Sequence, residues 1–263
     1  MDTVNPVPEY YQLPCDRAGN LEELQIPDFS SALVYLPFCY RSGQESLNTF
    51  YLLHGGGGSP EAVFSEDGLL KNMLDHMIDE GRIDPMIIIA PTYYPPGYSG
   101  KGISYSAEAV KDFGPILLSR IVPLVDRSFR TKADRMGRGI GGFSMGAVAV
   151  WYALMAGLNL FHWFMPLCGD CWICGERGGG LHPKQTAALL NDTLMGRSFY
   201  LHALIGDQDI AFPNLDPQMR AMKDFPETFS WGKNTHYTVM ENGVHDYACV
   251  RQYIYHALPA FFH

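Results

Sequence analysis

Apolar runs alternate with amphipathic stretches along this chain. The run "PMIIIAP" (85–91) has the continuous branched apolar character of a strand that is buried on both faces. The other predicted strands are 31–37, 49–55, 139–143, 163–168, 199–206 and 237–242. Helical periodicity lies between them, over 68–80, 106–128, 145–157, 184–195, 214–224 and 246–261. The alternation predicts an α/β fold with a mainly parallel central sheet and helices on both faces.

Two segments, 91–105 and 169–183, are too long and irregular to be simple connectors. Both are expected to follow the C-terminal ends of parallel strands, where α/β proteins bind ligands. No internal repeat or change of composition marks a second domain. We therefore expect one domain over 1–263, with residues 1–20 as an N-terminal extension.

Composition and charge narrow the classes of partner. The chain has 263 residues, of which 47% are hydrophobic, and this is ample for one large core. Its net charge of -9 opposes binding to nucleic acid or to an anionic membrane, and it favours a neutral or weakly charged substrate. The start of the chain lacks the pattern of a signal peptide. As written, the chain is expected to be cytoplasmic, or secreted if a leader has been removed. Its oligomeric state is left open.

The sequence "GFSMG" (142–146) has the form Gly-x-Ser-x-Gly between a predicted strand and a predicted helix. In such an elbow the glycines allow a tight turn, and the serine hydroxyl projects above the sheet beside the positive end of the helix. Ser144 is therefore a candidate nucleophile. The alternative is that Ser144 only caps the helix.

A serine nucleophile needs a histidine base that is oriented by a carboxylate. In this fold class the chain order is serine, acid, histidine, and His245 lies in the loop after the last predicted strand. Asp207 and Asp209 both follow the strand 199–206, and spacing alone does not separate them. Asp246 is expected to cap the last helix.

Two backbone N–H groups are needed to bind the oxyanion of the reaction. One would come from Met145, which follows the serine, and the other from the glycine-rich loop at 55–58. Elbow, loop and chain order together favour a Ser-His-Asp hydrolase, for which no cofactor is expected.

The segments "YLLHGGGGS", "RIDPMIIIAP", "GFSMG", "MPLCGDCW", "GDQD" and "NGVHDY" resemble the esterase D-like α/β-hydrolases. The similarity is to the carbohydrate esterase family that holds feruloyl and acetylxylan esterases. It implies an α/β-hydrolase fold with antiparallel N-terminal strands. It also implies that Ser144 and His245 act in ester hydrolysis, with the acid at Asp209 and the second oxyanion donor at Gly56.

Cys168, Cys171 and Cys174 have chelating spacing, with His182 or Cys249 as a fourth ligand. The favoured interpretation is buried free thiols beside the active site, because buried cysteine behaves as a small apolar residue. No metal is therefore expected.

The two long loops carry the residues that are expected to bind substrate. These are Trp172 with Asp170 in one loop, and Tyr93 and Tyr94, with Tyr98, in the other. Trp172 is either a plug that holds its loop down or a flat cleft wall, and the tyrosines would form the opposite wall. Such a cleft favours a feruloyl esterase that acts on small-molecule or polysaccharide esters of the plant cell wall. The alternatives are an acetylxylan esterase and a non-catalytic carbohydrate-binding protein of the same fold.

Overall fold

The computed structural model describes residues 6–64, 69–98 and 102–263. Three expectations reach beyond these residues. Residues 1–5 of the expected extension, residue 68 of the expected helix 68–80 and residues 99–101 of the first long loop lie outside the described part.

An eight-stranded sheet forms the centre of the molecule, in the order β1-β2-β4-β3-β5-β6-β7-β8. The strands are β1 (Asn20–Leu24), β2 (Ala32–Leu36), β3 (Asn48–Leu53), β4 (Met86–Pro91), β5 (Arg138–Phe143), β6 (Trp163–Leu167), β7 (Tyr200–Gly206) and β8 (Thr235–Met240). The pairs β1/β2 and β2/β4 are antiparallel, and every other pair is parallel. The expected α/β-hydrolase sheet with antiparallel N-terminal strands is confirmed.

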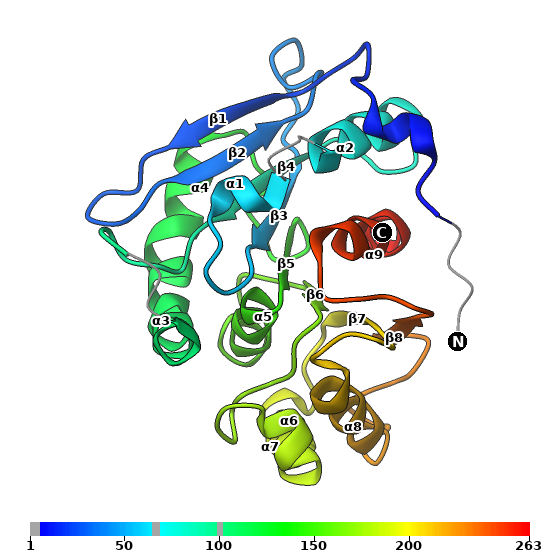
Figure 1. Cartoon of the computed structure of the whole chain (residues 1–263). Coiled ribbons are helices and arrows are strands. Elements are labelled where there is room, and N and C mark those ends of the chain that lie inside the picture. Colours follow the sequence, from blue (N-terminus) through cyan, green and yellow to red (C-terminus); the bar gives the residue numbers. More distant parts are fainter. Residues whose placement is uncertain (1–5, 65–68, 99–101) are drawn as a thin grey trace.

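Helices cover both faces of the sheet (Figure 1). They are α1 (Pro60–Phe64), α2 (Leu69–Asp79), α3 (Gly102–Ile116), α4 (Val122–Ser128), α5 (Met145–Ala156), α6 (Gly178–Leu181), α7 (Pro183–Leu194), α8 (Phe212–Met222) and α9 (Tyr247–Ala257). The helices α2 and α9 lie on one face, and α3, α5, α7 and α8 lie on the other. This arrangement buries the central strands β3, β4 and β5 at every position.

The helix predicted over 106–128 is not one regular helix. It consists of the end of α3, a π-helical turn at Leu117–Ile121 and α4. Proline lacks an N–H group and clashes with the carbonyl four residues earlier, so Pro115 and Pro123 prevent a continuous ladder of hydrogen bonds.

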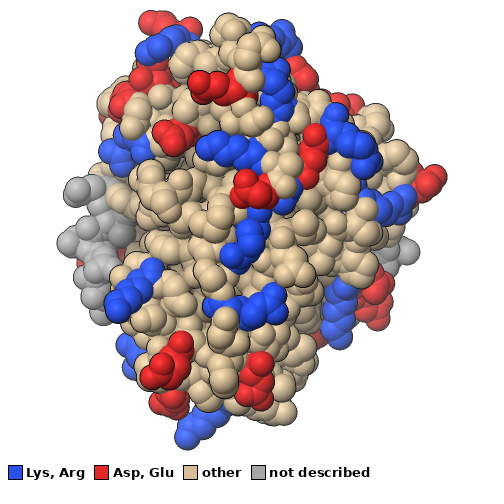
Figure 2. Space-filling model, turned by 180° about the vertical axis from the view of Figure 1, so that it is seen from behind, with Lys and Arg blue, Asp and Glu red and all other residues tan. Residues whose placement is uncertain are grey.

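None of the helices in the described part is both long and apolar enough to span a membrane. On the face shown in Figure 2, Lys and Arg side chains are interspersed with Asp and Glu side chains. That face therefore offers a mixture of both signs to a partner.

Candidate active site

Ser144 lies at a sharp turn between β5 and α5. Its φ of 56° and ψ of -114° are unusual for a residue other than glycine, and its backbone N–H donates to the carbonyl of Leu167 over 2.8 Å. A Cβ atom on Gly142 would lie 2.5 Å from the carbonyl oxygen of Gly146, and one on Gly146 would lie 2.7 Å from the carbonyl oxygens of Leu53 and His54. Only glycine fits at both positions, so these two glycines permit the turn.

The side chain of Ser144 does not cap α5, so the capping interpretation is wrong. Its hydroxyl lies 2.8 Å from Nε2 of His245, and Nδ1 of His245 lies 2.8 and 2.9 Å from the two carboxylate oxygens of Asp209. A carboxylate only accepts hydrogen bonds, so Nδ1 carries the proton and Nε2 accepts from the Ser144 hydroxyl. The three side chains form one continuous hydrogen-bonded relay.

The structure separates the two candidate acids. Asp209 is 3% exposed and contacts His245, whereas Asp207 accepts a 2.7 Å bond from the backbone N–H of Asn242. Gly206 allows the loop after β7 to approach the loop before α9. A Cβ on Gly206 would lie 2.1 Å from the Gly243 carbonyl oxygen, so only glycine fits there. That close approach brings the loop after β7 against the loop that carries His245.

Asp246, next to His245, begins the last helix. Its side chain accepts a 2.8 Å bond from the backbone N–H of Cys249, and this confirms it as the cap of α9.

The glycine-rich loop after β3 lies beside the elbow. Three of its amides have partners: Gly55 donates to the Tyr247 hydroxyl, Gly57 to the Tyr94 hydroxyl and Gly58 to the carbonyl of Gly55. The amide of Gly56 has none within the described residues, and neither has that of Met145. A Cβ on Gly56 would lie 3.6 Å from the Cβ of Met145, so these two residues are neighbours. Two unused donors therefore flank Ser144.

The expected wall of Tyr93, Tyr94 and Tyr98 is wrong. Tyr93 and Tyr94 are 1% and 3% exposed, and none of the three lines the cavity above Ser144. Tyr94 instead supports the glycine-rich loop through its hydroxyl, which also lies 2.6 Å from the Ser106 hydroxyl, and the Tyr98 ring stacks on the Tyr94 ring at 3.5 Å. Tyr93 and Tyr94 are thus core residues that pack against His54 beside the glycine-rich loop, and Tyr98 is half-buried against Tyr94.

His54 also supports the glycine-rich loop. It is fully buried, its Nδ1–H donates to the carbonyl of Gly55 over 2.7 Å, and its Nε2 accepts from the hydroxyl of Thr92 over 2.7 Å. Burial lowers the pKa of His54 to about 4, so this ring is neutral near pH 7. Sequence reasoning missed both His54 and Tyr247 as supports of the loop, and the adjacency of His54 to the glycines was the available signal.

A cavity of about 340 Å³ opens above Ser144 and His245. Trp172 and Asp170 line it, as does Ile210, which is 76% exposed. The Trp172 indole N–H donates to Asp170 over 3.0 Å, and the other Asp170 oxygen accepts from the N–H of Gly179 over 2.8 Å. Asp170 therefore holds the Trp172 ring at the cavity.

Several residues that sequence reasoning did not select also line this cavity, among them Ile210, Arg177 and Asn214. Ile210 follows the acid directly, so its place beside Asp209 was the only available signal. Arg177 and Asn214 come from the second long loop and from α8, and nothing in their local sequence marks them.

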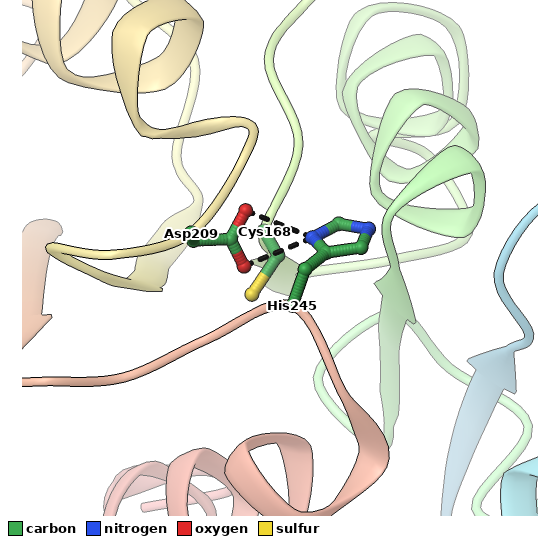
Figure 3. A group of neighbouring side chains, drawn as sticks. All are labelled: Cys168, Asp209 and His245. Carbon is green, nitrogen blue, oxygen red and sulfur yellow. Dashed lines mark hydrogen bonds and ion pairs between the residues drawn. The ribbon is translucent and has the colours of Figure 1, made fainter.

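Cys168, Asp209 and His245 form a cluster whose polar atoms all lie within 4.8 Å of one another (Figure 3). Burial raises the pKa of the Cys168 thiol well above its ordinary value, so the sulfur stays protonated and is a poor metal ligand. Burial also raises the pKa of Cys171, to about 12. Within the described residues Cys171 and Cys174 do not join this cluster, so the three cysteines do not converge as a zinc site would require.

Comparison with known proteins places the chain in a family. The Esterase family, described as "Putative esterase", matches residues 28–165. Endo-1,4-beta-xylanase Y of Acetivibrio thermocellus is 34% identical over an alignment of 281 positions, gaps included, that covers 98% of this chain and 24% of that protein. The "Endo-1,4-beta-xylanase/feruloyl esterase" of Xylanibacter ruminicola is 28% identical over 167 residues, covering 60% of this chain and 23% of that protein. The chain thus spans about a quarter of the length of these relatives.

Solved structures agree with this assignment. A mutant of the feruloyl esterase module from Clostridium thermocellum, complexed with sinapinate, has a TM-score of 0.83 at 32% identity and covers 100% of this chain and 95% of that one. A CE1 ferulic acid esterase from Anaeromyces mucronatus, with a TM-score of 0.75 at 15% identity over 100% and 98% of the two chains, shares the fold. Because the match covers more than half of the residues of this chain, the chain belongs to the Esterase family of α/β-hydrolases.

Proposed function

We propose that this chain hydrolyses esters of hydroxycinnamic acids, such as ferulate, with plant cell-wall polysaccharide. The observation that carries the proposal is the relay of Asp209, His245 and Ser144 beneath a cavity with an indole at its wall. Relatives named as feruloyl esterases support the choice of acyl group.

The proposed chemistry is acyl transfer in two steps. The Ser144 hydroxyl attacks the ester carbonyl while Nε2 of His245 takes its proton, and His245 then gives this proton to the departing alcohol. Water next attacks the acyl-enzyme, giving its proton to His245, which returns one to Ser144 as the acid leaves. Asp209 holds His245 in the required tautomer throughout.

The amides of Gly56 and Met145 are the proposed oxyanion donors. Both lie beside Ser144 without another partner in the described part of the chain, and Met145 begins α5, whose N-terminal end carries partial positive charge. Since Tyr94 and Tyr247 hold the flanking amides, the loop is preorganised although it consists of four glycines.

Trp172 is the proposed wall for the cinnamoyl ring. It lines the cavity with 8% of its surface exposed, and its orientation is fixed by Asp170. Stacking a planar acyl group on the indole is worth on the order of 2 kcal/mol, or about thirtyfold in specificity, which an acetyl group is too small to gain.

The test compares substrates. The wild-type protein is expected to hydrolyse methyl ferulate with a higher kcat/KM than it shows in releasing acetate from acetylated xylan. Trp172→Ala should lower kcat/KM for methyl ferulate roughly thirtyfold and for p-nitrophenyl acetate far less. A preference for acetylated xylan, or equal losses on both esters, would instead identify an acetylxylan esterase. Folded protein without turnover on any of these esters would favour a carbohydrate-binding role.

A further inference from the structure

A second cavity lies at the opposite ends of the strands from Ser144. It has a volume of about 520 Å³, larger than the active-site cavity, and its walls include Glu45, Asn48, Asp84, Arg130 and Lys132. We call it the basal cavity. Asn48 is the first residue of β3, whose other end leads to the glycine-rich loop, so the two cavities are roughly 20 Å apart along this strand.

Asn48 is the most informative wall residue. It is 4% exposed, and its side-chain amide forms no hydrogen bond within the described part of the chain. An amide offers two donors and an acceptor, and those of Asn48 are not sealed from the cavity, so a ligand there can bond them. The Asn48 amide is therefore a polar group of this wall that is free to bond a ligand.

The wall is rigid where this amide lies. Residue Leu47, next to Asn48, forms a parallel bridge with Thr131, and its N–H donates to the carbonyl of Arg130 over 2.9 Å. The guanidinium of Arg130 lies 4.1 Å over the ring of Tyr40 and also donates to the Tyr40 carbonyl. The Arg130 side chain is thus held in place before any ligand binds.

The charges of the wall indicate what kind of ligand fits. Glu45 and Asp84 are negative, Arg130 and Lys132 are positive, and none of the four forms an ion pair with a described residue. Any charged ligand would meet like charges here as well as opposite ones. A ligand whose groups both donate and accept, as hydroxyl groups do, matches carboxylates, an amide and cationic donors together.

We propose that the basal cavity binds a neutral oligosaccharide. Sites of 300 to about 1,000 Å³ hold small ligands, and Leu47 and Pro85 in the same wall offer apolar surface to the C–H faces of sugar rings. The choice of xylan as the sugar rests on the proposed function. Such a site would anchor the polysaccharide away from the ester that is being cleaved.

The test measures the binding of xylohexaose to the Ser144→Ala protein by isothermal titration calorimetry. Asn48→Leu and Asp84→Ala are each expected to weaken binding about tenfold, because each removes hydrogen bonds to the ligand. Asp84 is exposed and Asn48 has no partner to lose among the described residues, so both variants should fold, as thermal unfolding will verify. Asp224→Ala removes an exposed carboxylate elsewhere and should bind as the parent does.

Trp172→Ala in the same background distinguishes the two cavities. Binding that survives Trp172→Ala but is weakened by the basal variants would support the proposal. No binding, equal binding by all variants, or loss in Trp172→Ala alone would overturn it. The proposed function is judged separately, by the turnover of methyl ferulate, an ester that carries no sugar. Asp224→Ala should leave this turnover unchanged.

Discussion

Ser144 has a strained backbone because the tight turn between Gly142 and Gly146 holds it in an unusual backbone conformation. A non-glycine residue with φ near 56° costs on the order of 1 to 3 kcal/mol, and such strain is common where it aims a reactive group. Sequence reasoning selected Ser144 and His245 from the elbow and the chain order. Spacing alone left Asp207 and Asp209 open, because two residues of one turn differ only in which way their side chains point, and it was the family resemblance that implied Asp209.

Asp209→Asn is expected to lower kcat for methyl ferulate about 10⁴-fold, since an amide no longer fixes the tautomer of His245. Asp207→Asn is the matched control and should lose less than about tenfold, because among the described residues the Asp207 side chain bonds only the backbone N–H of Asn242 in the neighbouring loop. Stopped-flow or steady-state kinetics on both purified variants provides the comparison. Equal losses would remove the assignment of Asp209 as the acid.

Among the strands and loops, the fold was predictable wherever burial leaves a pattern in the sequence. The strands β3, β4 and β5 are buried at every position and were all predicted. The strand β1 was missed, because this edge strand pairs with β2 alone and its sequence "NLEEL" is largely exposed. Buried polar contacts such as the tyrosine supports of the glycine-rich loop leave no periodic pattern, and Tyr94 was therefore misplaced in the cleft.

The glycine-rich loop should depend on those supports. Tyr94→Phe removes the acceptor for the Gly57 amide and the bond to Ser106, which loosens the loop that holds Gly56. Because losing a direct oxyanion donor lowers kcat by a factor of about 10² to 10³, losing a support of the loop is expected to lower it roughly tenfold. KM for methyl ferulate should change less than about twofold.

Tyr237→Phe, on β8, is the control for this change, since the one hydrogen bond of the Tyr237 hydroxyl within the described part of the chain is a long one, 3.5 Å to Asp216. If both variants lose the same share of their turnover rate, the Tyr94 hydroxyl does not support catalysis.

Two buried histidines, His54 and His162, and the half-buried His202 make the stability of the protein as a whole depend on pH. Burial lowers the pKa of His54 and His162 to about 4 and that of His202 to about 3. The unfolded chain binds these protons near pH 6.5, so folding stability is complete above pH 6.5 and decreases as the pH falls toward 4. For His54 alone the decrease is roughly 3 kcal/mol.

Urea unfolding at intervals between pH 7 and pH 4 measures this effect. His202→Gln should flatten the decrease, because it removes one of the groups that resist protonation in the folded protein. His182→Gln, at an exposed position, should leave the curve unchanged. A free energy of unfolding that is constant between pH 6.5 and pH 4.5 would contradict the burial of neutral histidines.

The clearest test of catalysis by this protein is the turnover of methyl ferulate by the wild type and by Ser144→Ala. The hydroxyl of Ser144 is the atom that is proposed to form the acyl-enzyme, and its removal leaves the cavity and the fold in place. The wild-type protein is expected to hydrolyse the ester rapidly, and Ser144→Ala should turn it over more slowly by a factor of about 10⁴ or more, as a triad without its nucleophile does. A Ser144→Ala protein that retains a tenth of the wild-type rate would contradict the assignment of Ser144 as the nucleophile.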